Sequence, residues 1–85
     1  MTTKNGTDPV ERVYRHIGKV IKEQREKRGL IQQAIADKLK LSRASICMLE
    51  KGKQRVMMHD LPRIAEALGV PVIELIPPEW KRGEA

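Results

Sequence analysis

The stretch Gln32–Gly52, QQAIADKLKLSRASICMLEKG, decides the fold of this chain. Its apolar residues recur at the spacing of one face of a helix, first over residues 32–39 and again over residues 43–51. Ser42 is a good N-cap for the second of these helices, because its hydroxyl can accept a hydrogen bond from a free amide of the first turn. Only residues 40–42 remain between the two segments, so the sequence predicts two short helices that cross at a steep angle.

Such a crossing is a helix-turn-helix, and its residues resemble those of the phage-repressor and Cro-type (XRE) family. Gln32 stands where family members usually begin the first motif helix, and Glu50 and Gly52 match their E-x-G close. Arg25 matches the basic residue that the family pairs with that glutamate. The family's core positions hold Ile35, Ala36, Ile46 and Leu49. The resemblance covers residues 17–76 and implies an all-α, compact five-helix, lambda-repressor-like DNA-binding domain.

Two residues depart from the family pattern. Lys40 stands in the turn where the family commonly has glycine, and Ile31 stands where it often has a serine or threonine N-cap. A left-handed conformation would strain Lys40 by about 1–2 kcal/mol, and a missing cap costs about 1 kcal/mol. Either the turn differs from that of the family or the domain is less stable.

The composition is that of a small, basic protein. The 85 residues include 17 Lys and Arg against 11 Asp and Glu, which gives a net charge of +6 and a pI of about 9.8. Such a charge suits a polyanionic partner. Only Tyr14 and Trp80 are aromatic, so we expect an aliphatic core. Single-stranded RNA is a poor candidate partner, because its recognition relies on aromatic side chains that stack on bases.

No catalytic or metal-binding constellation is visible. Cys47 is the only cysteine, and His16 and His59 fall in separate segments without companion ligands. We therefore expect no metal, no cofactor and no enzymatic activity. No apolar run approaches the ~20 residues that span a membrane, and the N-terminal residues lack the apolar core of a signal peptide. We expect a cytoplasmic protein with no membrane partner, and the resemblance implies a bacterial or phage origin.

The chain divides into an arm, a domain and a tail. Residues 1–8 are expected to form a flexible arm and residues 9–76 the DNA-binding domain. The helix-turn-helix occupies residues 32–52 of that domain. Residues 77–85 then form a C-terminal tail, which we expect to be loose apart from its tryptophan.

The first helix has clear start and stop signals. Asp8 suits the N-cap and Pro9 the first helical position, while Gly29 suits the left-handed residue after the end. Val10 and Tyr14 lie in first turns that exceed the usual family helix. They are expected to cover either a partner subunit or the C-terminal segment of their own chain, and the sequence leaves both alternatives open.

Two further helices are expected after the motif. The fourth spans about residues 60–68 with Asp60 as N-cap, and a short fifth spans residues 72–76, which Pro77–Pro78 should stop. The second of these regions has more apolar surface than a short helix can hide, which usually marks an interface. We expect a homodimer through Val72, Ile73, Ile76 and Trp80. In the alternative, Ile76 and Trp80 fold back as a lid on the first helix.

The resemblance implies which residues read bases. Ile46 and Leu49 face inward, so the outward residues of the second motif helix are expected to enter the major groove. Arg43 suits guanine O6 and N7, or else a phosphate, and Met48 suits a thymine methyl, or else a protein partner. The expected base-reading residues are Ser42, Arg43, Ala44, Cys47 and Met48. Cys47 is expected to be a small groove-facing side chain, with a redox switch as the alternative.

Phosphate contacts are expected on either side of the reading helix. Gln32 fits the family's phosphate-clamping glutamine. The basic residues that follow the reading helix are Lys51, Lys53 and Arg55, and the alternative for them is an ordinary solvated surface. Arg25 and Glu50 are expected to form a buried structural ion pair.

These expectations point to a sequence-specific regulator of transcription that binds double-stranded DNA. We expect a dimeric repressor of an inverted-repeat operator, of the phage-repressor or restriction–modification controller type. The alternative is an antitoxin or another interaction module whose main role is to bind a partner protein, such as a toxin.

Overall fold

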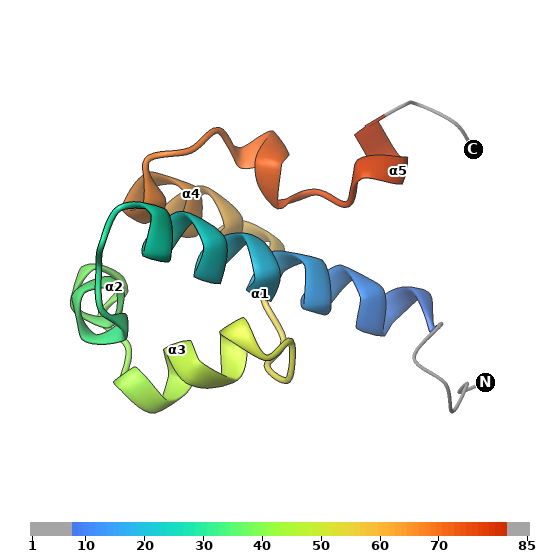
Figure 1. The fold of residues 1–85 in the computed structure, drawn as a ribbon. Helices are drawn as coiled ribbons and strands as arrows, with labels where there is room; N and C mark the ends of the chain where they lie inside the picture. The colour runs from blue at the N-terminus through green and yellow to red at the C-terminus, as the bar shows by residue number, and fades with distance from the viewer. Residues whose placement is uncertain (1–7, 82–85) are drawn as a thin grey trace.

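The computed structural model describes residues 8–81, and within that range every regular element is a helix. The expected all-α class is therefore confirmed for this part of the chain. The elements follow one another as α1 (Pro9–Lys27), α2 (Gln32–Leu39), α3 (Arg43–Glu50), the 3₁₀ turn η1 (Met58–Asp60), α4 (Leu61–Leu68), the 3₁₀ turn η2 (Val72–Leu75) and α5 (Pro78–Lys81) (Figure 1). Residues 1–7 of the expected arm and residues 82–85 of the expected tail lie outside the described range.

The longest helix, α1, is the central helix, and α3, α4 and η2 all pack against it. It begins as predicted, since the Asp8 carboxylate accepts a hydrogen bond of 2.8 Å from the Val10 amide and Pro9 occupies the first turn. Gly29 has the expected left-handed conformation, with a φ of +68°. In Figure 1, α3 lies on one side of α1, while α4 and η2 lie on the other. The reading helix and the C-terminal elements are thus held apart by the same helix.

The core is aliphatic, as expected. The side chains that form it come from every α-helix up to α4 and from η2: Ile17, Val20, Ile21, Ile35, Ala36, Leu39, Ile46, Leu49, Ile64, Ala65, Leu68 and Leu75. Neither aromatic residue is fully buried, because Tyr14 is half-buried and Trp80 is exposed. Within residues 8–81, no helix has both the length and the apolar character needed to cross a bilayer.

Both departures from the family pattern are present in the turn region. Lys40 adopts the left-handed conformation at φ 59° and ψ 42°, and the Leu41 amide donates to the Ala36 carbonyl at 2.9 Å to close α2. Ile31 provides no side-chain hydrogen bond to the start of α2. The tight turn is therefore formed by a residue with a Cβ in a conformation that favours glycine.

Two glycines allow the close approach of α1 to the end of α3. A Cβ atom on Gly18 would overlap the Leu49 carbonyl oxygen and would lie 2.8 Å from that of Glu50. Gly52 has a φ of +72°, and a Cβ there would lie 2.8 Å from the Arg15 Cα. Both glycines are required because backbone meets backbone at these points.

The predicted helix ends need correction after α2. The helix expected over residues 43–51 ends at Glu50, one residue early. Asp60 occupies the N-cap of α4, but its carboxylate accepts a hydrogen bond from the Met57 amide instead of capping α4. This bond closes η1, the 3₁₀ turn that leads into α4.

The expected fifth helix over residues 72–76 is wrong. The segment Val72–Leu75 forms a 3₁₀ turn instead, in which the Glu74 amide donates to the Pro71 carbonyl at 3.0 Å and the Ile76 amide to the Ile73 carbonyl at 3.1 Å. Pro78 does not stop a helix but begins one, the single turn α5, as the first helical position allows. The tail is therefore not loose throughout its length.

Candidate nucleic-acid interface

The outward face of α3 is accessible to solvent over most of its length, and Arg43 on this face contacts Gln32 at the start of α2. Ile46 and Leu49 are buried against the core, whereas Arg43, Ala44 and Met48 are exposed and Cys47 is half-buried. At 3.6 residues per turn, Arg43, Cys47 and Lys51 form one row along this face, and Ala44 and Met48 form the next. All four outward residues of α3 that were expected to read bases therefore share one accessible surface.

Ser42 has a structural role at the start of α3. Its hydroxyl oxygen accepts a hydrogen bond of 3.0 Å from the Ser45 amide and donates to the Ser45 hydroxyl at 3.1 Å. The predicted N-cap is confirmed. Because capping uses this hydroxyl, Ser42 is better suited to orient α3 than to contact a base.

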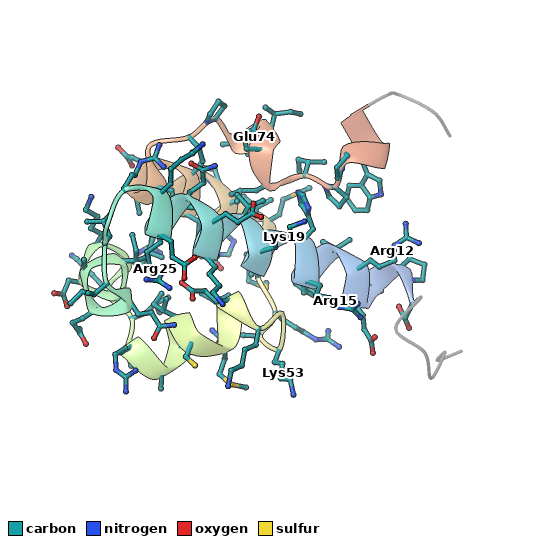
Figure 2. The ribbon with its side chains drawn as sticks, in the orientation of Figure 1. Arg12, Arg15, Lys19, Arg25, Lys53 and Glu74 are labelled. Carbon is teal, nitrogen blue, oxygen red and sulfur yellow. The ribbon has the colours of Figure 1, made fainter. Side chains whose placement is uncertain are left out.

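An ion pair fixes the other end of α3 to α1. The Arg25 guanidinium donates to Glu50 twice, from Nε to Oε2 at 2.6 Å and from Nη2 to Oε1 at 3.1 Å. The Arg25 side chain is 11% exposed and that of Glu50 is 4% exposed. A third bond of 2.8 Å runs from Arg25 Nη1 to the Leu30 carbonyl. Arg25 therefore joins α1, the loop before α2 and the end of α3 (Figure 2).

The charge state of Arg25 follows from this geometry. Hydrogen bonds to the Glu50 carboxylate raise the pKa of the guanidinium, burial acts in the opposite direction, and the charges of Glu50 and Glu26 raise it further. The net effect is a raised pKa, so Arg25 stays charged throughout the ordinary range of pH.

Gln32 connects the ion pair to the reading residues. Its Nε2 donates to Glu50 Oε1 at 3.0 Å, while its Oε1 accepts from Arg43 Nη1 at 3.5 Å. A chain of contacts thus runs from Arg25 through Glu50 and Gln32 to Arg43. This chain orients Gln32 at the start of α2, where the resemblance implied a phosphate clamp.

Residues 21–75 match the model of a helix-turn-helix family. The chain belongs to the helix-turn-helix family. The match covers more than half of the sequence and includes the Arg25–Glu50 pair, the turn at Lys40 and all of α3.

Solved structures of other proteins have the same fold. One is the restriction–modification controller protein C.AhdI from Aeromonas hydrophila, at 27% identity and a TM-score of 0.68, with 74% of this chain and 96% of that chain covered. Another is the controller protein C.Esp1396I, solved as a tetramer with its natural 35 base-pair operator, at 25% identity, a TM-score of 0.65 and coverage of 74% and 83%. A hypothetical transcription factor from Neisseria, NHTF, is similar in fold alone at 20% identity, with a TM-score of 0.71 and coverage of 96% and 93%. A search of curated proteins finds no match.

The helix-turn-helix protein carries cations along the edges of the α3 face. Lys51 follows α3 directly, and Figure 2 shows Lys53 on the side of the molecule where α3 lies. Arg55 is also exposed, in the loop that passes the first turns of α1. Lys22 of α1 lines a surface hollow together with Cys47 and Lys51. The structure therefore adds Lys22 to the basic residues expected from sequence.

The residues expected at a dimer interface lie away from the reading helix. Figure 1 shows η2 and α5 on the side of α1 opposite α3. Val72, Ile73 and Trp80 are exposed, by 51% for Ile73 and 55% for Trp80, and Ile76 is half-buried. Trp80 thus keeps more than half of its side chain exposed, while Ile76 is partly covered. Val10, in the first turn of α1, is 55% exposed as well.

Sequence reasoning missed Gly18 and Lys22. A glycine inside a helix costs about 1 kcal/mol relative to alanine, so Gly18 carried a usable signal of a close backbone approach. Lys22 carried none, because its place beside Lys51 depends on how α1 packs on α3. Among residues 8–81, no group of three or more His, Cys, Asp or Glu side chains is arranged to hold a metal ion.

Proposed function

We propose that this helix-turn-helix protein is a regulator of transcription that binds double-stranded DNA sequence-specifically. The observation that carries this proposal is the exposed face of α3, held in place by the Arg25–Glu50 pair and bordered by Lys22, Lys51 and Lys53. A helix of this width fits the major groove, and cations at its edges suit the phosphates on either side.

The similar structures support the same function. C.AhdI is a restriction–modification controller protein, and C.Esp1396I is a controller protein solved on its natural operator. Both resemble this chain over 74% of its length, at 25% identity or more. By this similarity the protein acts in the bacterial cytoplasm, on the nucleoid when it is bound. Residues 9–76 form the DNA-binding domain in this proposal, and residues 32–52 form its motif.

The proposed active species is a homodimer that represses transcription from an inverted-repeat operator. Apolar residues of η2 and α5 supply the interface: Val72, Ile73, Ile76 and Trp80. A two-fold dimer of such domains places its reading helices about 34–36 Å apart, one turn of the duplex. Arg43, Ala44, Cys47 and Met48 then read bases, while Gln32, Lys51, Lys53 and Arg55 contact phosphates.

Selection of bound duplexes from a random pool tests the proposal. The wild-type chain is expected to enrich an inverted repeat with half-sites centred about one helical turn apart. The matched variants are Arg43→Ala, which should enrich a different or weaker motif, and Met58→Ala, which alters an exposed methionine of η1 and should enrich the same motif. A pool that shows no enrichment, even at low salt, contradicts DNA reading. Co-purification of a stoichiometric protein without any enriched duplex would replace it with a partner-binding function.

A further inference from the structure

We infer that the middle of α3 reads the 5-methyl groups of pyrimidines in the major groove. This inference rests on the proposed function and names what its reading helix recognises. Between Arg43 at one end of the outward face and Lys51 at the other, the side chains are those of Ala44, Cys47 and Met48. Met48 is 39% exposed, and Ala44 is exposed as well. The atoms that this stretch presents to a base are therefore methyl carbons and sulfur atoms, and it has no strong hydrogen-bonding group.

The neighbouring polar side chains are engaged within the protein. The Ser42 hydroxyl caps α3 and donates to the hydroxyl of Ser45. The amide of Gln32 donates to Glu50 and accepts from Arg43. These contacts orient the flanking polar groups, and Arg43 is the only strong donor among the four outward residues of α3.

The chemistry of the base edges then selects the ligand. Thymine is the base that presents an apolar group in the major groove, its C5 methyl, whereas the other edges there present donors and acceptors. An apolar side chain pressed against such a donor or acceptor would leave it without a partner, at a cost in free energy. The same methyl group is present on 5-methylcytosine, which pairs as G·C. Methionine suits this role because its flexible, polarisable thioether adapts to the surface it contacts.

The positive charges around this face are complementary to the phosphates of DNA. Cations surround the apolar stretch, with Arg43 and Lys51 at its ends and Lys22 beside it on α1. Phosphate contacts from such residues fix the register of a reading helix without carrying sequence information. Sequence information at the centre of each half-site must then come from the contacts of Ala44, Cys47 and Met48.

Base analogues test the inference on the operator obtained by selection. Replacing one thymine by deoxyuridine removes only the methyl group, and burial of one such group predicts a loss of about four-fold in affinity. We expect this loss at one or more thymines in each half-site. At the same position, a 5-methylcytosine·guanine pair is expected to bind more tightly than a cytosine·guanine pair, because it restores the methyl group alone.

Variants assign the effect to the protein side. In Met48→Ala, the penalty for deoxyuridine is expected to disappear at the position that Met48 contacts. Met48→Leu keeps an apolar side chain and should retain the penalty, and Met58→Ala should retain it as well. Met48 is partly exposed on α3, so its replacement should leave the thermal unfolding of the protein unchanged, which circular dichroism checks.

The outcomes separate this inference from the proposed function. If the protein selects an operator but tolerates deoxyuridine at every thymine, the inference is overturned and DNA reading stands. A deoxyuridine penalty that persists in each of Met48→Ala, Ala44→Gly and Cys47→Ser also overturns it, because a group outside the apolar stretch then reads the methyl. If no operator is selected at all, the proposed function itself fails.

Discussion

Arg25 and Glu50 stand 25 residues apart in the sequence, yet the Arg25 Nε and the Glu50 Oε2 lie 2.6 Å from each other. The carboxylate is almost completely buried and also accepts a hydrogen bond from Gln32. A buried charge of this kind is stable only while its partners are present, since desolvation of an isolated carboxylate is costly. The position of α3 on α1 therefore depends on a side chain that lies outside the helix-turn-helix itself.

Removal of the Glu50 charge is expected to destabilise the protein strongly. Glu50→Ala and Glu50→Gln strand the buried guanidinium, at a cost of about 3–5 kcal/mol in the free energy of unfolding. Denaturant melts measure this loss. The control is Glu26→Gln, because Glu26 is an exposed neighbour 3.8 Å from Arg25 and should change the stability by less than about 1 kcal/mol. Equal effects of the Glu50 and Glu26 variants would show that burial of the pair is unimportant.

The contribution of Arg25 to stability is expected to be independent of pH near neutrality. A cation whose pKa is raised by folding stabilises the fold at every pH below its unfolded pKa, and this stabilisation is lost only as the pH rises through the folded pKa. For an arginine, both values lie far above neutral pH. The stability difference between wild type and Arg25→Gln, measured by urea melts, should therefore stay constant between about pH 6 and pH 9. A difference that falls across this range would contradict the raised pKa.

Gly18→Ala is expected to destabilise the protein more than Gly29→Ala. Backbone preference alone predicts the opposite, because alanine favours a helix interior by about 1 kcal/mol and disfavours the left-handed conformation of Gly29 by about 1–2 kcal/mol. A Cβ on Gly18, however, overlaps the Leu49 carbonyl oxygen, whereas nothing lies within 4 Å of one on Gly29. Overpacking typically costs about 1–3 kcal/mol and occasionally more. A cost above this typical range is expected at Gly18, because the overlapped atoms belong to the backbone and cannot rotate away as a side chain can, and such a cost exceeds the gain in helix preference. Thermal melts of the two variants give the order, and the reverse order would rule out close contact between α1 and α3.

Lys40→Gly is expected to stabilise the protein. Lys40 is in the left-handed region, so glycine removes the strain, while its greater freedom in the unfolded state offsets part of the gain. A net gain of up to about 1 kcal/mol would raise the melting temperature by about 4–8 °C in a domain of this size. Lys38→Gly, within α2, is the control and should lower it. A fall in melting temperature for both variants would show that the turn does not strain Lys40.

The exposed apolar residues of η2 and α5 are expected to hold the dimer together. Ile73→Asp adds a charge to this surface and Trp80→Ala removes its largest side chain, so both should shift the protein towards monomer in sedimentation experiments. Ile31→Asp adds the same charge at an exposed isoleucine before α2 and should leave the dimer intact. A wild-type protein that is monomeric at high concentration would refute the interface.

Arg43 and Lys53 are expected to have separable effects on DNA binding. Arg43→Ala should cost about 1–3 kcal/mol on the operator and relax discrimination at one base pair, because a bidentate contact with guanine is lost. Lys53→Ala should weaken binding to all sequences and lower the slope of log affinity against log salt by about one. Titrations on operator, single-base variants and random DNA at several salt concentrations distinguish them. The reverse pattern would mean that α3 docks differently.

Much of the fold was predictable because its signals are local. Asp8, Pro9 and Gly29 mark the ends of α1, and the spacing of apolar residues marks α2 and α3. The structure after Gly69 was not predictable in this way. Each proline there is compatible with either the start or the end of a helix, and the choice depends on packing against α1. A hydrogen bond of 3.3 Å between His16 Nε2 and the Glu74 carbonyl is one such long-range contact.

The candidate site was predictable to a different degree. The outward positions of α3 follow from helical periodicity once Ile46 and Leu49 are assigned to the core. The contact between Gln32 and Arg43 does not follow from helical periodicity, because it depends on the angle at which α2 and α3 cross. The position of Lys22 beside Cys47 does not follow from periodicity either, because it depends on the close contact between α1 and α3 at Gly18.

The chain of contacts from Arg25 to Arg43 also bears on how operator preference can evolve. Its weakest link is the outermost one, the 3.5 Å contact between Gln32 and Arg43, while Glu50 keeps both Arg25 and Gln32 as partners if Arg43 is replaced. Replacement of Arg43 therefore leaves no buried charge without a partner. Ala44 and Met48 are equally free of the core. A descendant could thus acquire a new operator through these positions while it inherits the ancestral stability unchanged.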